Sequence, residues 1–300
     1  MGSPITAPPA SAAAGPPPVA SRPAASPSAV AFPPASPASL PLGPLLLADA
    51  AAAVGAASLV APAIAVIDKA IFCHASGRAP LPRGLTHGLS LVTRRPVHFL
   101  GQPSFLLVWL VYVTTYACAN SASTLALTTA DSDAMPKFIA TSVANVSASL
   151  AKDGYFTRAF GPPPSTSRPV GWNSYGLYMI RDGLTIWASF TVPPLVGAAL
   201  ATRKLLPVDY CQPVAQLLTP VTVQLVSTPI HLWGMDLYNR PSASIPQRLA
   251  FVQAQYGAAT LARMSRIFPA FGIGGVANTA FRARGVQAVQ AYRDGRGFVL

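Results

Sequence analysis

The sequence predicts an all-α integral membrane protein with six transmembrane helices, arranged as three tandem two-helix repeats. Apolar residues make up 51% of the chain and charged residues only 10%, against about 25% charged residues in an ordinary soluble domain. Asp supplies the whole acidic complement, and the chain contains no Glu. A soluble surface needs far more charge, so this composition indicates a protein embedded in a bilayer.

A weak threefold repeat of charged residues sets the number of helices. Three Asp residues, 85 and 83 positions apart, lie near the ends of apolar stretches: Asp68, Asp153 and Asp236. Three Arg residues, 86 and 85 positions apart, lie near the starts of the following stretches: Arg95, Arg181 and Arg266. A common period near 85 indicates three copies of one unit, an apolar segment, a polar loop and a second apolar segment. The repeats fall at about residues 43–127, 128–206 and 207–285.

The chain divides into a membrane domain and two tails. Residues 1–42 consist mostly of Pro, Ala, Ser, Gly and Val, with Arg22 as their only charge. Such a segment cannot bury a core, so we expect a disordered tail that is available to dock a protein partner. The membrane domain is expected at 43–285, and a basic C-terminal tail at 286–300.

Six apolar segments account for the expected helices. In order they are residues 44–67, 105–127, 138–151, 172–199, 213–235 and 267–281. The second, which includes LLVWLVYVTTYACANS, is the clearest span. The third has about two-thirds of the roughly 20 residues that a span needs, so it must tilt, extend into its polar flanks or be shielded by protein. The sixth is short and rich in Gly.

Positive charge is distributed unevenly between the loops. The three loops inside the repeats are long and basic, whereas the links between repeats are short. The positive-inside rule therefore places these loops on one side of the membrane, where they are expected to meet anionic lipid headgroups. The basic C-terminal tail falls on the opposite side in a six-span topology, which conflicts with this rule.

The repeated charges are candidates for a gate. Asp or Arg beside a membrane span is costly unless it is paired. The three Asp residues end the first helices of the repeats, and the three Arg residues begin the second helices on the same side. They are therefore expected to form a ring of ion pairs that closes one mouth of a central cavity. The alternative is that they are solvated helix ends at the headgroup level.

Arg181 and Asp182 are the candidate substrate-binding residues, because apolar residues flank the pair on both sides. A guanidinium aimed into a cavity binds a carboxylate or phosphate in a bidentate manner. The adjacent carboxylate is suited to an amine. The alternative is that Arg181 pairs with Asp153 and holds two helices together.

Other polar residues in the apolar segments are expected to join helices. Asn120, Asn145 and Asn278 have small neighbours, so hydrogen bonds between closely packed helices are predicted for them, with cavity lining as the alternative. His231 is interpreted as an interhelical donor rather than a proton relay.

Several function classes lack a supporting pattern. Three Cys residues show no spacing typical of a disulfide framework or a metal site. The glycines at 272–275 lack the strand and helix of a dinucleotide fold, and no cofactor is predicted. No catalytic motif indicates an enzyme. The net charge of +12 comes without a basic run, so nucleic acid is not an expected partner.

The arrangement of the repeats resembles the mitochondrial carrier family. The matching residues are Pro62 with Asp68-Lys69, Pro229 with Asp236, Arg95-Pro96, and Arg266 with Pro269. The family's Pro-x-(Asp/Glu)-x-x-(Lys/Arg) signature is intact in none of the repeats, so the chain resembles a degenerate member. The resemblance covers roughly residues 43–285. It implies a six-helix pseudo-threefold bundle in the mitochondrial inner membrane.

Two functions follow from that resemblance. The first is a carrier-like transporter that moves a small anionic or zwitterionic metabolite by alternating access. The second is a non-transporting scaffold, receptor or protein-insertion factor, for which the outer mitochondrial membrane is the implied location. The Arg181-Asp182 pair favours the first, and the altered signature and Pro-rich tail favour the second.

Overall fold

The computed structural model describes residues 40–129, 134–162 and 168–294, and every regular element in these ranges is helical. The predicted all-α class is therefore confirmed. The expected N-terminal tail lies outside the described residues as far as residue 39. The last six residues of the expected C-terminal tail also lie outside them.

The helices of the first half are α1 (Leu42–Ala75), α2 (Leu81–Arg94), α3 (Pro96–Leu100), α4 (Pro103–Thr129) and α5 (Ala134–Phe160). Those of the second half are α6 (Trp172–Phe190), α7 (Val192–Thr202), α8 (Val208–Thr222), α9 (Gln224–Asn239), α10 (Ile245–Ile267), the π-helix η3 (Phe268–Gly274) and α11 (Gly275–Arg293). The last helix therefore includes residues expected in the basic tail.

Proline and glycine account for the interrupted helices of the second half. The axes of α6 and α7 differ by 41°, and two prolines, Pro193 and Pro194, lie at the start of α7. Neither can donate the backbone hydrogen bond that would continue α6. Pro269 and three glycines lie in or beside η3, where the chain widens to π geometry. By contrast, α1 runs as one helix through Pro62.

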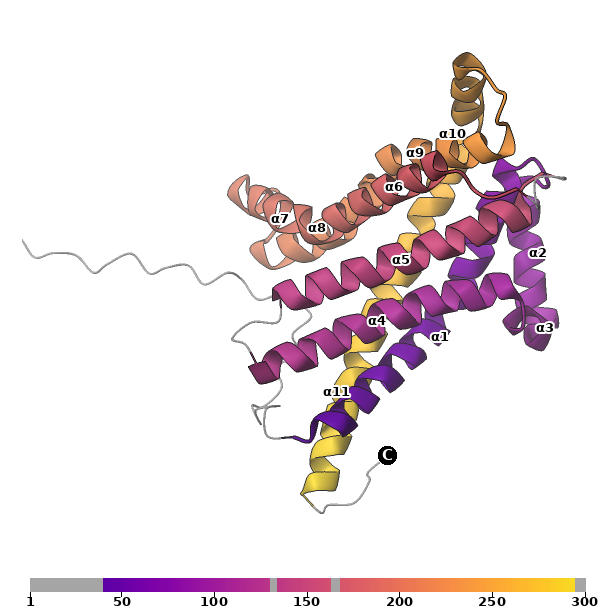
Figure 1. The fold of residues 1–300 in the computed structure, drawn as a ribbon. Helices are drawn as coiled ribbons and strands as arrows, with labels where there is room; N and C mark the ends of the chain where they lie inside the picture. The colour runs from indigo at the N-terminus through magenta and orange to yellow at the C-terminus, as the bar shows by residue number, and fades with distance from the viewer. Residues whose placement is uncertain (1–39, 130–133, 163–167, 295–300) are drawn as a thin grey trace, which may run out of the picture.

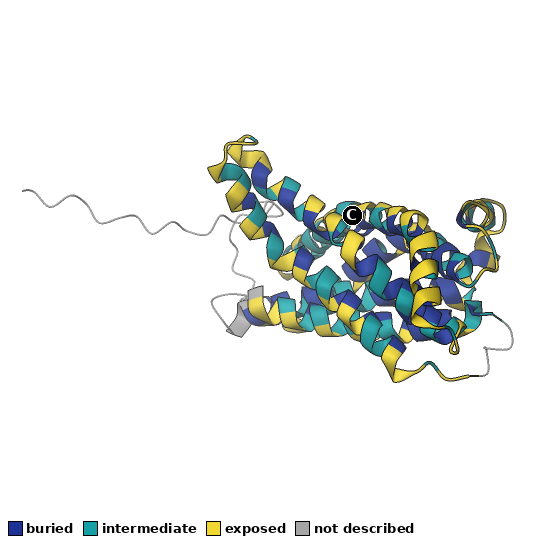
Figure 2. Ribbon diagram, turned by 90° about the horizontal axis from the view of Figure 1, so that it is seen from above, coloured by how far each residue is buried: buried dark blue, intermediate teal, exposed yellow. Residues whose placement is uncertain are grey.

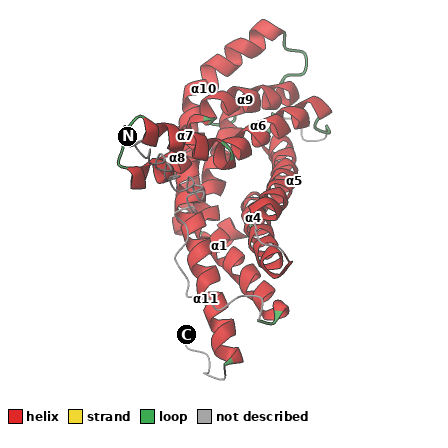
Figure 3. Ribbon diagram, turned by 90° about the vertical axis from the view of Figure 1, so that its left-hand side faces the viewer, coloured by secondary structure: helices red, strands yellow, loops and turns green. Residues whose placement is uncertain are grey.

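The long helices form a closed ring of six rods (Figures 1 and 3). In chain order the rods are α1, α4, α5, α6–α7, α8–α9 and α10–η3–α11, and each packs against the next. The ring closes where η3 and α11 pack against α1. The amphipathic helix α2 packs against α1 and belongs to none of the rods.

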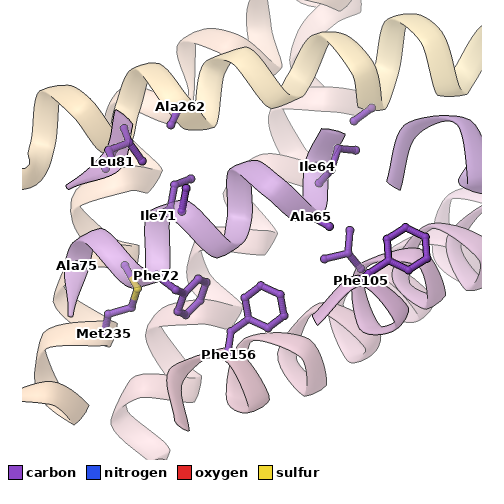
Figure 4. Close-up of a cluster of buried hydrophobic side chains, with 14 of the residues drawn as sticks. Ile64, Ala65, Ile71, Phe72, Ala75, Leu81, Phe105, Phe156, Met235 and Ala262 are labelled. Atoms are coloured by element: carbon purple, nitrogen blue, oxygen red, sulfur yellow. The ribbon is translucent and has the colours of Figure 1, made fainter. Parts of the chain in front are cut away.

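The apolar core is organised around α1 (Figure 4). Ile64, Phe72 and Ala65 of α1 belong to one buried cluster with Phe105 of α4 and Phe156 of α5. The cluster also includes residues of α9 and α10. The rings of Phe72 and Phe156 meet edge to face, with centroids 5.3 Å apart. The buried turns face the interior, and many outward turns are exposed (Figure 2).

Length and hydropathy identify fewer spans than the six expected. Within the described residues, α1 and the Pro103–Ala126 part of α4 are long and apolar enough to cross a membrane. A third span results if the bent α6–α7 pair counts as one. The six-span prediction is thus not confirmed. The third expected segment lengthens into α5, which gains charges such as Lys152, Asp153 and Arg158. The remaining rods, α8–α9 and α10–η3–α11, are each interrupted where one of their helices ends and the next begins.

Candidate functional site

A layer of buried charges lies between five of the helices that form the ring. We call it the charge layer and define it as Asp68, Lys152, Asp153, Arg181, Asp182, His231, Arg263 and Arg266. All but Arg266 are at most 6% exposed, and the Arg266 side chain is 18% exposed. Charged side chains at this depth must be paired or must bind a ligand, because burying an unpaired ion costs several kcal/mol.

Asp68 joins three rods. Its Oδ2 accepts a hydrogen bond from Lys152 of α5 at 2.8 Å, and its Oδ1 accepts one from Arg266 of α10 at 2.5 Å. The sequence placed Asp68 and Arg266 in one set of candidate gate residues, and the structure brings their side chains together. Lys152 was missed, although it directly precedes the predicted Asp153.

Asp153 connects this part of the layer to α6. Its carboxylate lies 2.6 Å from Lys152 and 2.6 Å from Arg181. Arg181 also donates through Nε and Nη2 to Oδ1 of Asp182, at 3.0 and 2.6 Å. Its Nη1 lies 2.7 Å from Nδ1 of His231, which must be the acceptor because arginine has no acceptor atom. All three nitrogens of Arg181 are thus engaged, an arrangement that favours the helix-joining interpretation.

Aromatic rings pack directly against this part of the layer. The His231 ring lies 5.3 Å from Phe72 and 5.3 Å from Tyr178, measured between centroids. The Tyr178 hydroxyl lies 2.8 Å from Thr157 Oγ1. Because these rings come from α1, α6 and α9, they fill space between the rods beside the ion pairs.

Asp236 does not pair with a member of the predicted Arg triplet. It accepts from Arg240 at 2.6 Å and from Arg248 at 2.7 Å. The expectation that Arg95 begins the second helix of its repeat and joins the ring is wrong. Arg95 is exposed between α2 and α3, and α4 begins eight residues later at Pro103. Proline residues start both α3 and α4, so the helix begins later than the apolar pattern indicated.

Three members of the charge layer have buried side-chain atoms without a hydrogen bond in the described part of the chain, and one of them, Asp153, is held by its ion pairs with Lys152 and Arg181. Among the residues that the structure describes, Oδ2 of Asp182 has no hydrogen-bond partner, and neither does Nε of Arg263. Arg263 was missed by the sequence reasoning, although it precedes Arg266 by three residues and therefore shares a helix face with it. The layer thus contains one acid and one base that are available to a ligand.

A second polar cluster joins α1, α4 and α11. Asp49 Oδ1 accepts from Arg282 Nε at 2.8 Å, and its Oδ2 accepts from Thr124 Oγ1 at 2.5 Å. Asn120 and Asn278 exchange side-chain hydrogen bonds at 2.9 and 2.8 Å. Helix packing was predicted for both Asn residues. The Asp49 pairing was not, since no pattern connected residues more than 230 positions apart.

The third predicted packing residue lies between α4 and α5. Asn145 Nδ2 donates to Thr115 Oγ1 at 3.2 Å. All three Asn side chains therefore reach a neighbouring rod.

The distribution of polarity over the ring defines the class of protein. Charged and polar side chains are buried between the rods, whereas large apolar side chains are exposed on their outer turns, as at Leu110, Val143, Trp187 and Val226. Water would disfavour this arrangement and lipid would favour it. The protein is therefore a helical integral membrane protein.

Comparison with known families identifies the group. A family model described as "Probable citrulline exporter" matches residues 51–286, and the chain belongs to that family. A comparison with curated proteins gives no match. The family assignment corrects the expected membership in the mitochondrial carrier family, with which no match is found. Two-helix repeats with charges at their ends are generic enough for the resemblance to arise without that membership. The mitochondrial location, which rested on it, stays a prediction.

Proposed function

We propose that this protein exports a small zwitterionic amino acid, and that citrulline, which the family description names, is the first substrate to test. The observation that carries the proposal is the charge layer, in which one carboxylate oxygen and one guanidinium remain available between the rods. Buried ionisable groups inside a membrane protein are expensive and typically mark a solute pathway. The family match supports export rather than a structural role.

Asp182 is the proposed contact for the substrate's ammonium group. Its Oδ1 is held by Arg181, which fixes the carboxylate plane, while Oδ2 is buried and has no partner in the described ranges of the chain. An ammonium group donates three hydrogen bonds and carries the complementary charge. This assignment retains Asp182 from the predicted pair, while Arg181 positions it.

We propose that all six rods cross the bilayer as three two-helix repeats. The exposed apolar side chains on the outer turns of every rod support this topology. So does the position of a buried acid in each of α1, α5 and α9, namely Asp68, Asp153 and Asp236. Charged residues lower the hydropathy of the later rods, but several of them, such as Asp236, Arg248 and Arg263, are buried and therefore do not meet lipid.

Export proceeds by alternating access in this proposal. In this cycle, the charge layer and the adjoining aromatic rings form the barrier between the rods that must open for the substrate to pass. Opening requires the pairs between rods to separate, above all Asp68 with Arg266 and Asp153 with Arg181. A bound zwitterion changes the charges around Arg181 and Asp182 and so can bias the two states.

Efflux from liposomes tests the proposal. The purified full-length chain is reconstituted into vesicles loaded with radiolabelled citrulline, and efflux is compared with that of protein-free vesicles. Saturable efflux is expected. Asp182→Asn should raise KM roughly 10- to 100-fold, the range for loss of one charge-assisted hydrogen bond. Arg284→Gln is the control, because Arg284 is exposed on α11.

Efflux no faster than from protein-free vesicles, for citrulline and for related neutral amino acids, would refute the proposed function. Saturable efflux with an unchanged KM in Asp182→Asn would retain export but remove the assigned role of Asp182.

A further inference from the structure

The most unusual buried charge in the molecule is Arg263 on α10. It is 2% exposed, and its Nη2 donates to Ser227 Oγ of α9 at 3.3 Å. Its Nε has no acceptor, and it makes no ion pair within the described residues. A guanidinium carries five N–H donors and stays protonated in proteins. Arg263 is thus a buried cation with most of its donors unused.

The acids near Arg263 are already committed to other cations. The negative charges of Asp68 and Asp182 attract the Arg263 guanidinium, whereas the positive charges of Arg266 and Arg181 repel it. Asp68 is engaged by Lys152 and Arg266, and Asp182 by Arg181.

The charge layer therefore holds three acids against four basic side chains. The acids are Asp68, Asp153 and Asp182, and the basic residues are Lys152, Arg181, Arg263 and Arg266. No acid among the described residues compensates this excess of one positive charge. Burial of an uncompensated charge costs several kcal/mol, so the site has a strong preference for one anionic group.

We propose that Arg263 binds the carboxylate of the exported amino acid, through Nε and the neighbouring Nη nitrogen. Planar guanidinium and carboxylate groups match in a bidentate geometry that lysine cannot reproduce. This inference rests on the proposed function and completes its site. Arg263 takes the anionic end of the zwitterion, and Oδ2 of Asp182 takes the ammonium end.

The surroundings of Arg263 suit a substrate with a neutral polar side chain. Thr260 lies one helical turn before Arg263 on α10, is 4% exposed, and has a hydroxyl without a partner. Ser227 and Gln224 line the facing turn of α9, and both are fully buried. Ser227 Oγ donates to Gln224 Oε1 at 3.1 Å, and Gln224 Nε2 donates to the Pro220 carbonyl at 3.0 Å. The Thr260 hydroxyl is therefore the uncharged group on offer, and it fits a urea or amide group better than a charged side chain.

A comparison of two substrates isolates the carboxylate contact. Efflux is measured for citrulline and for its analogue without the carboxylate, N-(4-aminobutyl)urea, in the full-length protein and in Arg263→Gln. The unsubstituted protein should prefer citrulline in kcat/KM by roughly 10- to 100-fold, the contribution of a charge-assisted bidentate pair. Arg263→Gln should greatly reduce that preference, because citrulline loses its carboxylate contact and the cationic analogue no longer meets an uncompensated positive charge.

Two further variants separate binding from folding. Arg263→Lys keeps the positive charge but loses the planar pair of guanidinium donors, so it should retain only part of the preference for citrulline over the analogue. Without ligand, Arg263→Gln should unfold at the same or a higher temperature, because it removes an uncompensated buried charge. Arg248→Gln should unfold at a lower temperature, because it breaks a buried pair with Asp236.

The outcomes distinguish this inference from the proposed function. If citrulline is exported but Arg263→Gln keeps the original preference over the analogue, the Arg263 site is refuted and export stands. If no export is seen, but citrulline stabilises the protein against heat and fails to stabilise Arg263→Gln, export is refuted and the carboxylate site stands. If Arg263→Gln unfolds at a markedly lower temperature without ligand, Arg263 has a structural role and the proposed carboxylate site is refuted.

Discussion

Substitution of Asp68 by Asn is the sharpest test of the ion pairs that join the rods. Asn has nearly the same shape but no charge, so packing is preserved while two ion pairs are lost. Lys152 keeps a partner, because it also lies 2.6 Å from Asp153. Arg266 has no other acceptor within the described residues. The main cost is therefore the partly buried charge of Arg266.

The expected magnitude follows from this difference. Removal of one partner from a fully buried pair costs about 3 to 5 kcal/mol. The Arg266 side chain is 18% exposed, and access to water reduces the penalty, so we expect about 2 to 3 kcal/mol for Asp68→Asn. Asp153→Asn should cost less, since Lys152 retains Asp68 and Arg181 retains Asp182.

A double-mutant cycle measures the pair itself. Reversible unfolding in mixed detergent micelles gives the free energy of unfolding for Asp68→Asn, Arg266→Met and the double variant. Because Met removes the stranded cation, the double variant should recover most of the loss. A coupling free energy of about 1 to 3 kcal/mol is expected, within the range found for residues in contact.

The reasoning fails if the two single changes add to within about 0.5 kcal/mol, which is the behaviour of independent sites. It also fails if Asp153→Asn destabilises the protein more than Asp68→Asn, since that order contradicts the assigned partners.

Two further predictions concern packing outside the charge layer. Thr124→Val removes the hydroxyl that donates to Asp49 at 2.5 Å and accepts from Arg282 at 2.9 Å. The free energy of unfolding should therefore fall by about 1 to 3 kcal/mol. An unchanged free energy of unfolding in micelles would contradict this prediction. Gly84→Val should release α2 from α1, because even a Cβ at residue 84 would lie 3.0 Å from Ala70 Cβ and 3.1 Å from Ala70 Cα. Faster proteolysis within residues 77–95 measures this release. Unchanged cleavage would argue against the close contact.

The helical class and several site residues could be predicted from local properties. A low charge content, long apolar segments and the absence of Glu are sufficient to indicate membrane helices, since lipid tolerates little else. The period near 85 and the same cost of burying charge singled out Asp68, Asp153, Arg181 and Arg266, because each lies in or beside an apolar stretch. That argument depends on composition and spacing, both of which are visible in one dimension.

The particular partners were decided by the tertiary structure. Asp236 pairs with Arg240 and Arg248, neither of which belongs to the predicted Arg triplet. Arg95 is left outside the ring, because α4 begins only at Pro103. The pairing of Asp49 with Arg282 depends on closure of the ring between α1 and α11. Neither contact follows from spacing along the chain.

Arg263 shows most clearly which features the sequence determines and which the tertiary structure decides. The sequence by itself determined that an arginine lies on the charged face of α10, three residues from Arg266. Only the tertiary structure decided that the nearby acids are occupied by Lys152, Arg181 and Arg266, which leaves Arg263 without one. The physical reason is that pairing of charges depends on distance in space between several helices, and the order of residues along one helix does not determine it.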